Sequence, residues 1–309
     1  DFRPSFLRLM GHVLEMTDAT QFMMVGDPNQ MLYDYNEDDP AQLDYLTRPQ
    51  DFFVNSRSWR TVHLYETHRM TPEMAHIVGE TFAVRLESPK EPGTPVEVYT
   101  INMWRAGALV ARLLRGLNIC ECTILVPRKK NNGPLRATVN YLSRQGFRLF
   151  IHGIDGQDPR VKRNKLSVST WHASKGTQRR VCVVLGLAGE SEFNPSFVAL
   201  TRAQERLIIL QEQASPHHSL MHALQRAPAD FAIVDRATRD MLADLSALPQ
   251  APVWERSKDS ISVDEWRPSG SGKWVSELVD VTACSSRLSA DSDGDDPSPS
   301  QGDDALAGM

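Results

Sequence analysis

Four polar segments carry the side chains best suited to binding an anion, and each lies beside an apolar run. They are GDPNQMLYDY at 26–35, HRMTPEMA at 68–75, STWHASKGTQ at 169–178 and FVALTRAQ at 197–204. Arg69 and Arg202 stand out within them, because an arginine fixed beside a helix or strand can stabilise the negative charge of a phosphoryl group. Taken alone, each arginine is better explained as an ordinary surface side chain.

The first segment follows the apolar run FMMV. A polar loop at the carboxyl end of a strand is a common place for phosphate contacts. Asp27 and Gln30 are short hydrogen-bonding side chains, and Tyr33 and Tyr35 have flat faces on which an unpaired base can stack. A surface turn with two half-buried tyrosines also explains these residues.

The third segment clusters polar side chains after the apolar run LSVS. These side chains are Thr170, His172, Ser174 and Lys175. Gly176 follows them directly, and a glycine lets the backbone approach a ligand as it does in phosphate-binding loops. The pattern favours a ligand-binding loop over a loop that is only polar.

Short strands that alternate with helices must position these segments. We expect strands at 21–26, 61–65, 95–101, 122–127, 147–153, 166–171, 180–187 and 206–210. We expect helices at 2–16, 71–82, 107–117, 135–146 and 196–204, and two more within 219–248. This alternation predicts an α/β fold with a parallel sheet and binding sites at the carboxyl ends of its strands. Beyond Pro249 the Pro, Ser, Gly and Asp content predicts disorder.

The order and spacing of the four segments resemble the third to sixth motifs of UvrD/Rep-type superfamily 1 helicases. GDPNQMLYDY resembles G-D-x-x-Q-S-I-Y-R-[WF], HLYETHRM resembles L-x-x-N-Y-R-S, STWHASKGTQ resembles M-T-x-H-x-S-K-G-L-E and FVALTRA resembles Y-V-A-L-T-R-A. The opening Asp1-Phe2 also resembles the end of the family's second motif, D-E-A-Q-D-F. The resemblance covers residues 1–212.

The resemblance implies two RecA-like domains that clamp ATP between them, with DNA running across their tops. It assigns 1–58 to the end of the first domain and 59–215 to the second domain. The pattern of the remaining residues predicts a helical extension at 216–248, and their composition predicts a largely disordered, acidic tail at 249–309. The implied partners are single-stranded DNA and duplex junctions, and the motif spacing favours 3′→5′ movement. Because a DNA helicase acts on intracellular DNA, the resemblance also implies an intracellular location, in the nucleus or the cytoplasm.

The resemblance also implies the role of each site residue. Its nucleotide contacts are Asp27, Gln30, Arg69, Gly176, Gln178 and Arg202. Among these, Gln30 would sense the γ-phosphate, and Arg69 and Arg202 would be arginine fingers. Its nucleic-acid contacts are Tyr33, Tyr35, Thr170, His172, Ser174 and Lys175. Tyr35 would stack on an unpaired base, a contact worth about 1–3 kcal/mol.

Departures from the family pattern concern the ATP site. The 309 residues contain no G-x-x-x-x-G-K-[ST] loop, and Gly270–Lys273 is followed by Trp274 instead of the hydroxyl residue that binds Mg²⁺. We expect the Mg²⁺-binding Asp-Glu pair to lie upstream of Asp1, so this chain supplies no metal ligand. Gln178 replaces the usual Glu, and Thr67-His68 replaces the usual Asn-Tyr.

Two further interpretations remain. One is a catalytically inactive nucleic-acid-binding or regulatory module descended from a helicase, although Gln30 and both arginines argue for retained ATP chemistry. The other is a helicase–nuclease fusion, for which Asp264-Glu265 and Lys273 are a thin signal. The large accessory domain that well-studied relatives insert between the positions of Arg69 and Thr170 is expected to be missing, because this interval holds only strands and helices of the core.

Composition is that of a globular protein, with 41% hydrophobic and 24% charged residues. The longest apolar run, around Val181–Leu187, is too short to span a membrane. The net charge of −5 does not exclude nucleic acid, because six Asp and one Arg follow Ser285 and leave the rest neutral. The four cysteines lack a zinc spacing, so we expect reduced, packed thiols.

Overall fold

The computed structural model describes residues 4–16, 22–32, 46, 48–53, 59–128, 132–152, 164–189 and 191–234. The chain divides into two compact units, Asp1–Arg267 and Pro268–Met309, and every described residue belongs to the first. Tyr33, Tyr35 and the tail expected at 249–309 therefore lie outside the described residues.

A parallel β-sheet forms the centre of the described fold. Its strands among the described residues are β1 (Val96–Ile101), β2 (Cys122–Val126), β3 (Leu149–Ile151), β4 (Leu166–Thr170), β5 (Arg179–Leu187), β6 (Ala203–Glu212) and β7 (Ala232–Val234). Their order in this seven-stranded sheet is β3-β4-β2-β5-β6-β1-β7, and every pairing is parallel. The predicted α/β fold with a parallel sheet is confirmed.

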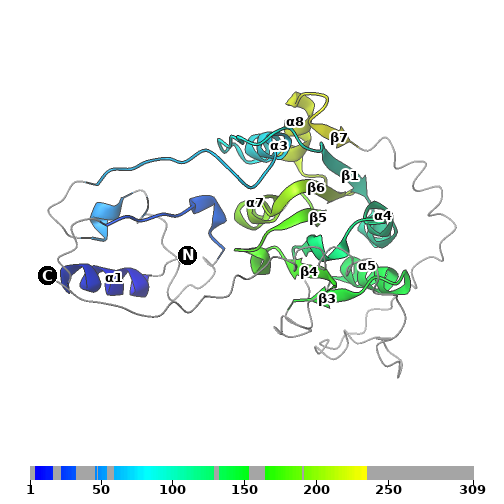
Figure 1. Cartoon of the computed structure of the whole chain (residues 1–309), viewed down its shortest axis with the longest axis horizontal. Coiled ribbons are helices and arrows are strands. Elements are labelled where there is room, and N and C mark those ends of the chain that lie inside the picture. Colours follow the sequence, from blue (N-terminus) through cyan, green and yellow to red (C-terminus); the bar gives the residue numbers. More distant parts are fainter. Residues whose placement is uncertain are drawn as a thin grey trace, which may run out of the picture. The chain divides into compact units, whose positions relative to one another are not determined.

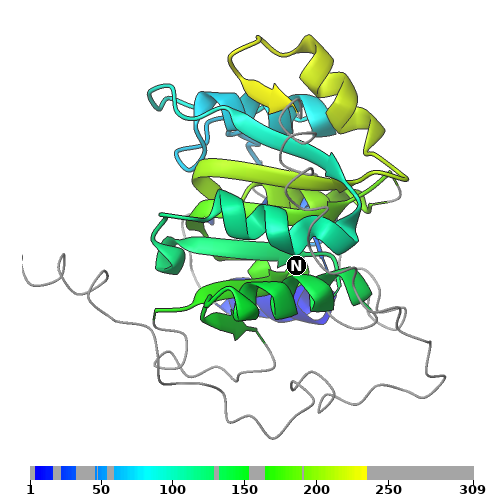
Figure 2. The same cartoon turned by 90° about the vertical axis from the view of Figure 1, so that its right-hand side faces the viewer.

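Helices cover both faces of this sheet (Figures 1 and 2). One face packs against α4 (Ala106–Leu113) and α5 (Gly133–Arg144), and the other packs against α3 (Pro72–Phe82), α7 (Phe193–Leu200) and α8 (His218–Arg226). Side chains alternate along a strand, so Val183 enters the first core and Val184 the second. Burial on both faces explains why the strands read as nearly continuous apolar runs.

Local sequence determines where the helices begin. The Thr71 hydroxyl accepts the Met74 N–H at 3.5 Å, and Pro72 occupies the first position of α3. Asn132 caps α5 in the same way, accepting the Leu135 N–H at 2.9 Å. The helices predicted over 71–82 and 135–146 are confirmed within about two residues at each end.

Two predicted strands, at 21–26 and 61–65, do not form. Residues 22–26 and 61–65 belong to no strand, and the nearest pairing is the isolated parallel bridge Glu66↔Glu87. Both segments have the composition of a strand but no neighbouring strand among the described residues. A strand needs such a neighbour to satisfy its backbone N–H and C=O groups, so composition alone does not produce it.

The sheet also extends past the domain end predicted at 215. The first helix expected in 219–248 is confirmed as α8, but Ala232–Val234 is the edge strand β7 beside β1. Three residues are too few for periodicity to reveal, and the open edge of β1 supplies the hydrogen bonds. Likewise, the helix predicted over 196–204 ends at Leu200, and β6 begins at Ala203.

The N-terminal part contains α1 (Pro4–Met16), which confirms the predicted helix, and the short turn η2 (Pro49–Asp51). The apolar side chains of α1 lie on two sides of the helix. Leu7 and Phe53 are buried together, with Met10 and Leu14 packed against them. The other apolar side chains of α1 are exposed: Phe6, Leu9, Val13 and Met16.

The described residues between Arg69 and Thr170 are elements of the sheet fold, from α3 to β4, with no additional helical or β domain in the described part of that interval. Cys122 and Cys182 pack in opposite cores. Burial raises the pKa of the Cys122 thiol to about 11 and that of Cys182 to about 12, so these two cysteines pack as unreactive small hydrophobes. No helix in the described ranges is both long enough and apolar enough to cross a membrane.

Candidate functional site

Arg202 lies in the turn between α7 and β6 and is 1% exposed. Its Nε donates to the Val198 carbonyl at 2.7 Å, and one terminal nitrogen donates to the Thr201 hydroxyl at 2.8 Å. The same nitrogen donates to Gln30 Oε1 at 3.1 Å, and the other reaches the Thr177 carbonyl at 3.4 Å. These acceptors are neutral, and the Asp27 carboxylate, which partly offsets the lowering of the Arg202 pKa, is linked to the guanidinium only through Gln30. Arg202 was predicted to lie on the helix; its bond to Val198 instead closes the end of α7.

Arg69 approaches the same turn from the segment that precedes α3. One of its terminal nitrogens donates to the Thr201 carbonyl at 3.0 Å. Its Nε is buried and has no hydrogen-bond partner among the described residues. Arg69 and Arg202 thus converge on Thr201, one through the main chain and one through the hydroxyl.

The two guanidiniums act on each other electrostatically. Burial, followed by the charge of Arg69, lowers the pKa of Arg202 to about 10. Both causes have the same meaning: a positive charge held away from water and beside another positive charge is less stable than in water. An anion placed between the two guanidiniums would relieve this repulsion.

The GDPNQ loop reaches this turn through η1 (Pro28–Gln30). Asp27 caps η1, accepting the Asn29 N–H at 3.0 Å, and also accepts the Gln30 side-chain amide at 2.7 Å. The Gln30 amide nitrogen therefore faces Asp27, while its oxygen accepts from Arg202. The structure brings together Asp27, Gln30, Arg69 and Arg202, four of the six residues that the resemblance assigns to the nucleotide.

The segment from β4 to β5 crosses from one edge of the sheet to the other. Thr170 pairs with Val126 at the carboxyl end of β2, whereas Arg179 pairs with Ala203 at the amino end of β6. Thr170 and His172 therefore lie at the carboxyl edge. The arginine cluster lies at the amino ends of β5 and β6, so the prediction that the sites lie at the carboxyl ends is wrong for it. The reason is that Arg202 immediately precedes its strand instead of following one.

A type II turn explains the glycine in this crossing segment. The Thr177 N–H donates to the Ser174 carbonyl at 2.9 Å, Lys175 has φ −55° and ψ 134°, and Gly176 has φ +78°. A type II turn requires positive φ at its third residue, which favours glycine. A Cβ at Gly176 would meet open space, so the turn and not a tight approach requires glycine here.

Among the other members of the crossing segment, Ser174 departs from its predicted role. Ser174 is buried, and its hydroxyl donates to the Trp171 carbonyl at 2.6 Å, so it holds the turn and offers no surface for nucleic acid. Burial and then the charge of Arg202 lower the pKa of Lys175, which places its ammonium in the field of the arginine cluster. Thr170 Oγ1 accepts the Ala173 N–H at 3.1 Å. Gln178 is exposed.

Sequence reasoning missed three residues that hold the cluster together. Thr201 receives both arginines, the Thr177 carbonyl accepts from Arg202, and Lys90 donates to the Arg69 carbonyl at 2.6 Å. Thr201 lies in the family-like motif FVALTRA, directly before Arg202, so the motif could have indicated it. Nothing in the sequence around Lys90 points to this site.

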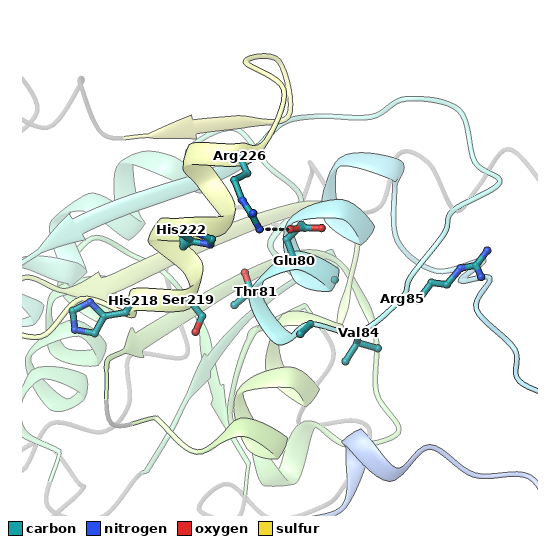
Figure 3. A pocket seen from close by; sticks show the side chains of 10 residues that line it. Glu80, Thr81, Val84, Arg85, His218, Ser219, His222 and Arg226 are labelled. Carbon is teal, nitrogen blue, oxygen red and sulfur yellow. Dashed lines mark ion pairs between the residues drawn. The ribbon is translucent and has the colours of Figure 1, made fainter.

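Two other features of the described residues lie apart from this cluster. A groove between α3 and α8 holds the Glu80–Arg226 ion pair at 3.9 Å, and none of the predicted site residues lines it (Figure 3). In the described part of the chain, no three His, Cys, Asp or Glu side chains are placed to hold a metal ion. The cluster fits an anionic phosphoryl group and does not fit Mg²⁺.

Comparison with known proteins yields no matching family model and no matching curated protein. Among solved structures, the chain is similar to the C-terminal domain of a possible DNA helicase from Lactobacillus plantarum WCFS1, with 13% identity and a TM-score of 0.41, over 55% of this chain and 99% of that one. It is also similar to the C-terminal domain of the DEAD-box protein Dbp5, with 11% identity and a TM-score of 0.33. The match covers 50% of this chain and 97% of that one. A chain in the structure of E. coli DEAD-box protein SrmB bound to RraA is similar as well, with 14% identity and a TM-score of 0.34. The match covers 48% of this chain and 94% of that one. Similarity at this level does not assign an activity.

Proposed function

We propose that this chain supplies the arginine-bearing face of the ATP site in a DNA helicase or translocase. The observation that carries the proposal is the convergence of Arg69 and Arg202 on Thr201. Among the described residues no carboxylate forms an ion pair with either arginine. Two partly desolvated guanidiniums in this arrangement favour a ligand with dense negative charge, such as the terminal phosphate of ATP.

Each residue has a distinct part in this proposal. Arg69 and Arg202 stabilise the charge on the terminal phosphoryl group, the contribution that arginine fingers make to phosphoryl transfer. Gln30 is oriented by Asp27 and exchanges its bond to Arg202 for one to the phosphate. Lys175 adds a third positive charge. The phosphate-cradling loop and the Mg²⁺ ligands come from outside these 309 residues.

Two of the proposed nucleic-acid contacts, Thr170 and His172, lie at the carboxyl edge of the sheet, opposite the arginine cluster. Thr170 and His172 are proposed to bind the DNA backbone there, and Tyr33 and Tyr35 to stack on bases; the family-like motif spacing supports DNA and a 3′→5′ direction. Residues 171–178 connect the two edges directly. A shift of the type II turn on nucleotide binding would therefore move the residues proposed to contact DNA.

The decisive experiment measures binding of ATP and of inorganic tripolyphosphate to the full 309-residue chain by calorimetry. We expect weak binding that Arg202→Ala and Arg69→Ala each weaken about tenfold or more, because a charge-assisted hydrogen bond contributes about 1.5–3 kcal/mol. Arg144→Ala, on an exposed arginine in the last turn of α5, is the control and should leave binding unchanged.

Arg202 is buried, so Arg202→Lys is included to keep a cation there, with thermal unfolding recorded for every variant. Equal affinity of the wild-type chain and a folded Arg69→Ala variant would overturn the proposal. We further expect no ATP hydrolysis by this chain alone, with or without single-stranded DNA. Turnover above a buffer control would show that the phosphate-binding elements lie within these residues.

A further inference from the structure

A strap of residues 87–94 holds the segment that carries Arg69. The Thr67 N–H donates to the Glu87 carbonyl at 2.7 Å, and the Glu87 N–H donates to the Tyr65 carbonyl at 2.9 Å. The Ser88 hydroxyl donates to the Met70 carbonyl at 2.7 Å. These bonds fix the main chain on both sides of Arg69.

Lys90 joins this strap to β6, the strand that follows the second arginine. Its ammonium donates to the Arg69 carbonyl at 2.6 Å and to the Gln204 carbonyl at 3.4 Å. Gln204 lies on β6, two residues after Arg202. The Thr94 hydroxyl donates to the Glu205 carbonyl at 2.8 Å, so the strap contacts β6 at a second point.

The side chain of Arg69 makes few hydrogen bonds among the described residues. Its Nε has no partner among the described residues, and a single bond, to the Thr201 carbonyl, directs its guanidinium. Because one hydrogen bond directs the guanidinium, the position of that group depends on where the Arg69 main chain is held. Lys90 contributes the bond at the Arg69 carbonyl itself, because an ammonium has several donors on a flexible stem and can bridge two carbonyls from different segments.

We infer that Lys90 is a positioning residue that sets the spacing between Arg69 and Arg202 and thereby the fit of an anionic phosphoryl group. This inference rests on the proposed function. Lys90 acts through the Arg69 main chain, since its ammonium is directed at carbonyl oxygens and not at the anion. Its effect on anion binding therefore requires the Arg69 side chain.

A double-mutant cycle on the full chain tests this dependence, with tripolyphosphate as the probe. Lys90→Met, which keeps the stem and removes the ammonium, should weaken binding about three- to tenfold, in the range of coupling between residues of one hydrogen-bond network. In the Arg69→Ala background the same change should have no effect. Lys90→Arg should restore most of the affinity.

Lys165→Met is the matched control, because Lys165 is also half-buried and precedes β4. It should bind as tightly as wild type. Unchanged binding by Lys90→Met, or an equal loss with and without the Arg69 side chain, would overturn the inference. If Arg69→Ala and Arg202→Ala lose tripolyphosphate affinity but Lys90→Met keeps it, the proposed function stands and only the inference fails. If all three variants bind as tightly as wild type, the proposed function itself is refuted.

Discussion

The described residues within 4–65 and those within 66–234 carry the same kinds of apolar pattern but bury them to different extents. In the second region, strands such as β2 are buried along their whole length. In the first, Met23 is 84% exposed and Leu64 is 80% exposed, although both occupy runs with the composition of strands. The helix α1 likewise buries one side and exposes its other apolar stripe.

The difference teaches that an apolar pattern predicts a strand or a buried face only where a partner surface exists. β5 lies between β2 and β6, so its backbone groups are paired on both sides and its side chains meet a core on each face. Residues 22–26 have neither among the described residues. The two regions nevertheless meet at the site, where Gln30 accepts from Arg202.

The largest expected effect comes from shortening a side chain in the sheet core. Leu210 on β6 is fully buried, so Leu210→Ala should lower the free energy of unfolding by about 2–5 kcal/mol. Leu9→Ala, on the exposed stripe of α1, is the matched change and should cost about 0.5 kcal/mol or less. Urea unfolding followed by circular dichroism gives both values, and equal losses would show that the contrast between the regions does not hold.

A smaller effect is expected from pH at His217, which caps α8 by accepting the Leu220 N–H at 3.2 Å on Nδ1. Burial, and then His218, lower the pKa of His217, so the folded state favours the neutral ring. The unfolded chain takes up the proton near pH 6.5. Stability is therefore unaffected above that pH and falls as the pH drops below it.

Urea midpoints measured between pH 8 and pH 5 test this dependence. His217→Asn keeps a capping side chain without a titrating ring and should flatten the acid loss. The control substitution lies in the other region: His12→Asn makes the same change at an exposed histidine of α1, 3.5 Å from Glu15. Identical slopes for wild type and His217→Asn would contradict the role of the ring.

The smallest effect is expected in the extended segment before residue 66. Val62→Ser with Leu64→Ser should change the free energy of unfolding by no more than about 0.5 kcal/mol, because both side chains are exposed. The same variant should bind less of a hydrophobic dye, since exposed apolar surface is removed. Val98→Ser, at a fully buried valine, should unfold at a clearly lower urea concentration. A large loss in the double variant would show that residues 62 and 64 are packed in solution.

The sequence alone was sufficient for much of the sheet, and it selected four residues that the structure brings together. β1, β2, β4, β5 and β6 formed where apolar runs predicted them, because burial on both faces leaves a strong local signal. α3 began at Thr71-Pro72 for an equally local reason. Asp27, Gln30, Arg69 and Arg202 could be selected because the order and spacing of the motifs around them resemble those of a known family.

Tertiary structure alone decided which of these residues meet and at which edge of the sheet. Arg69 and Thr201 are 132 positions apart, and Gln30 and Arg202 are 172 apart, so no local pattern records their contacts. The same holds for the bridge from Lys90 to Gln204 and for the pairing of β7 with β1. Local sequence determines backbone conformation and the alternation of apolar side chains, whereas a hydrogen bond between distant segments forms only once packing has brought its donor and acceptor together.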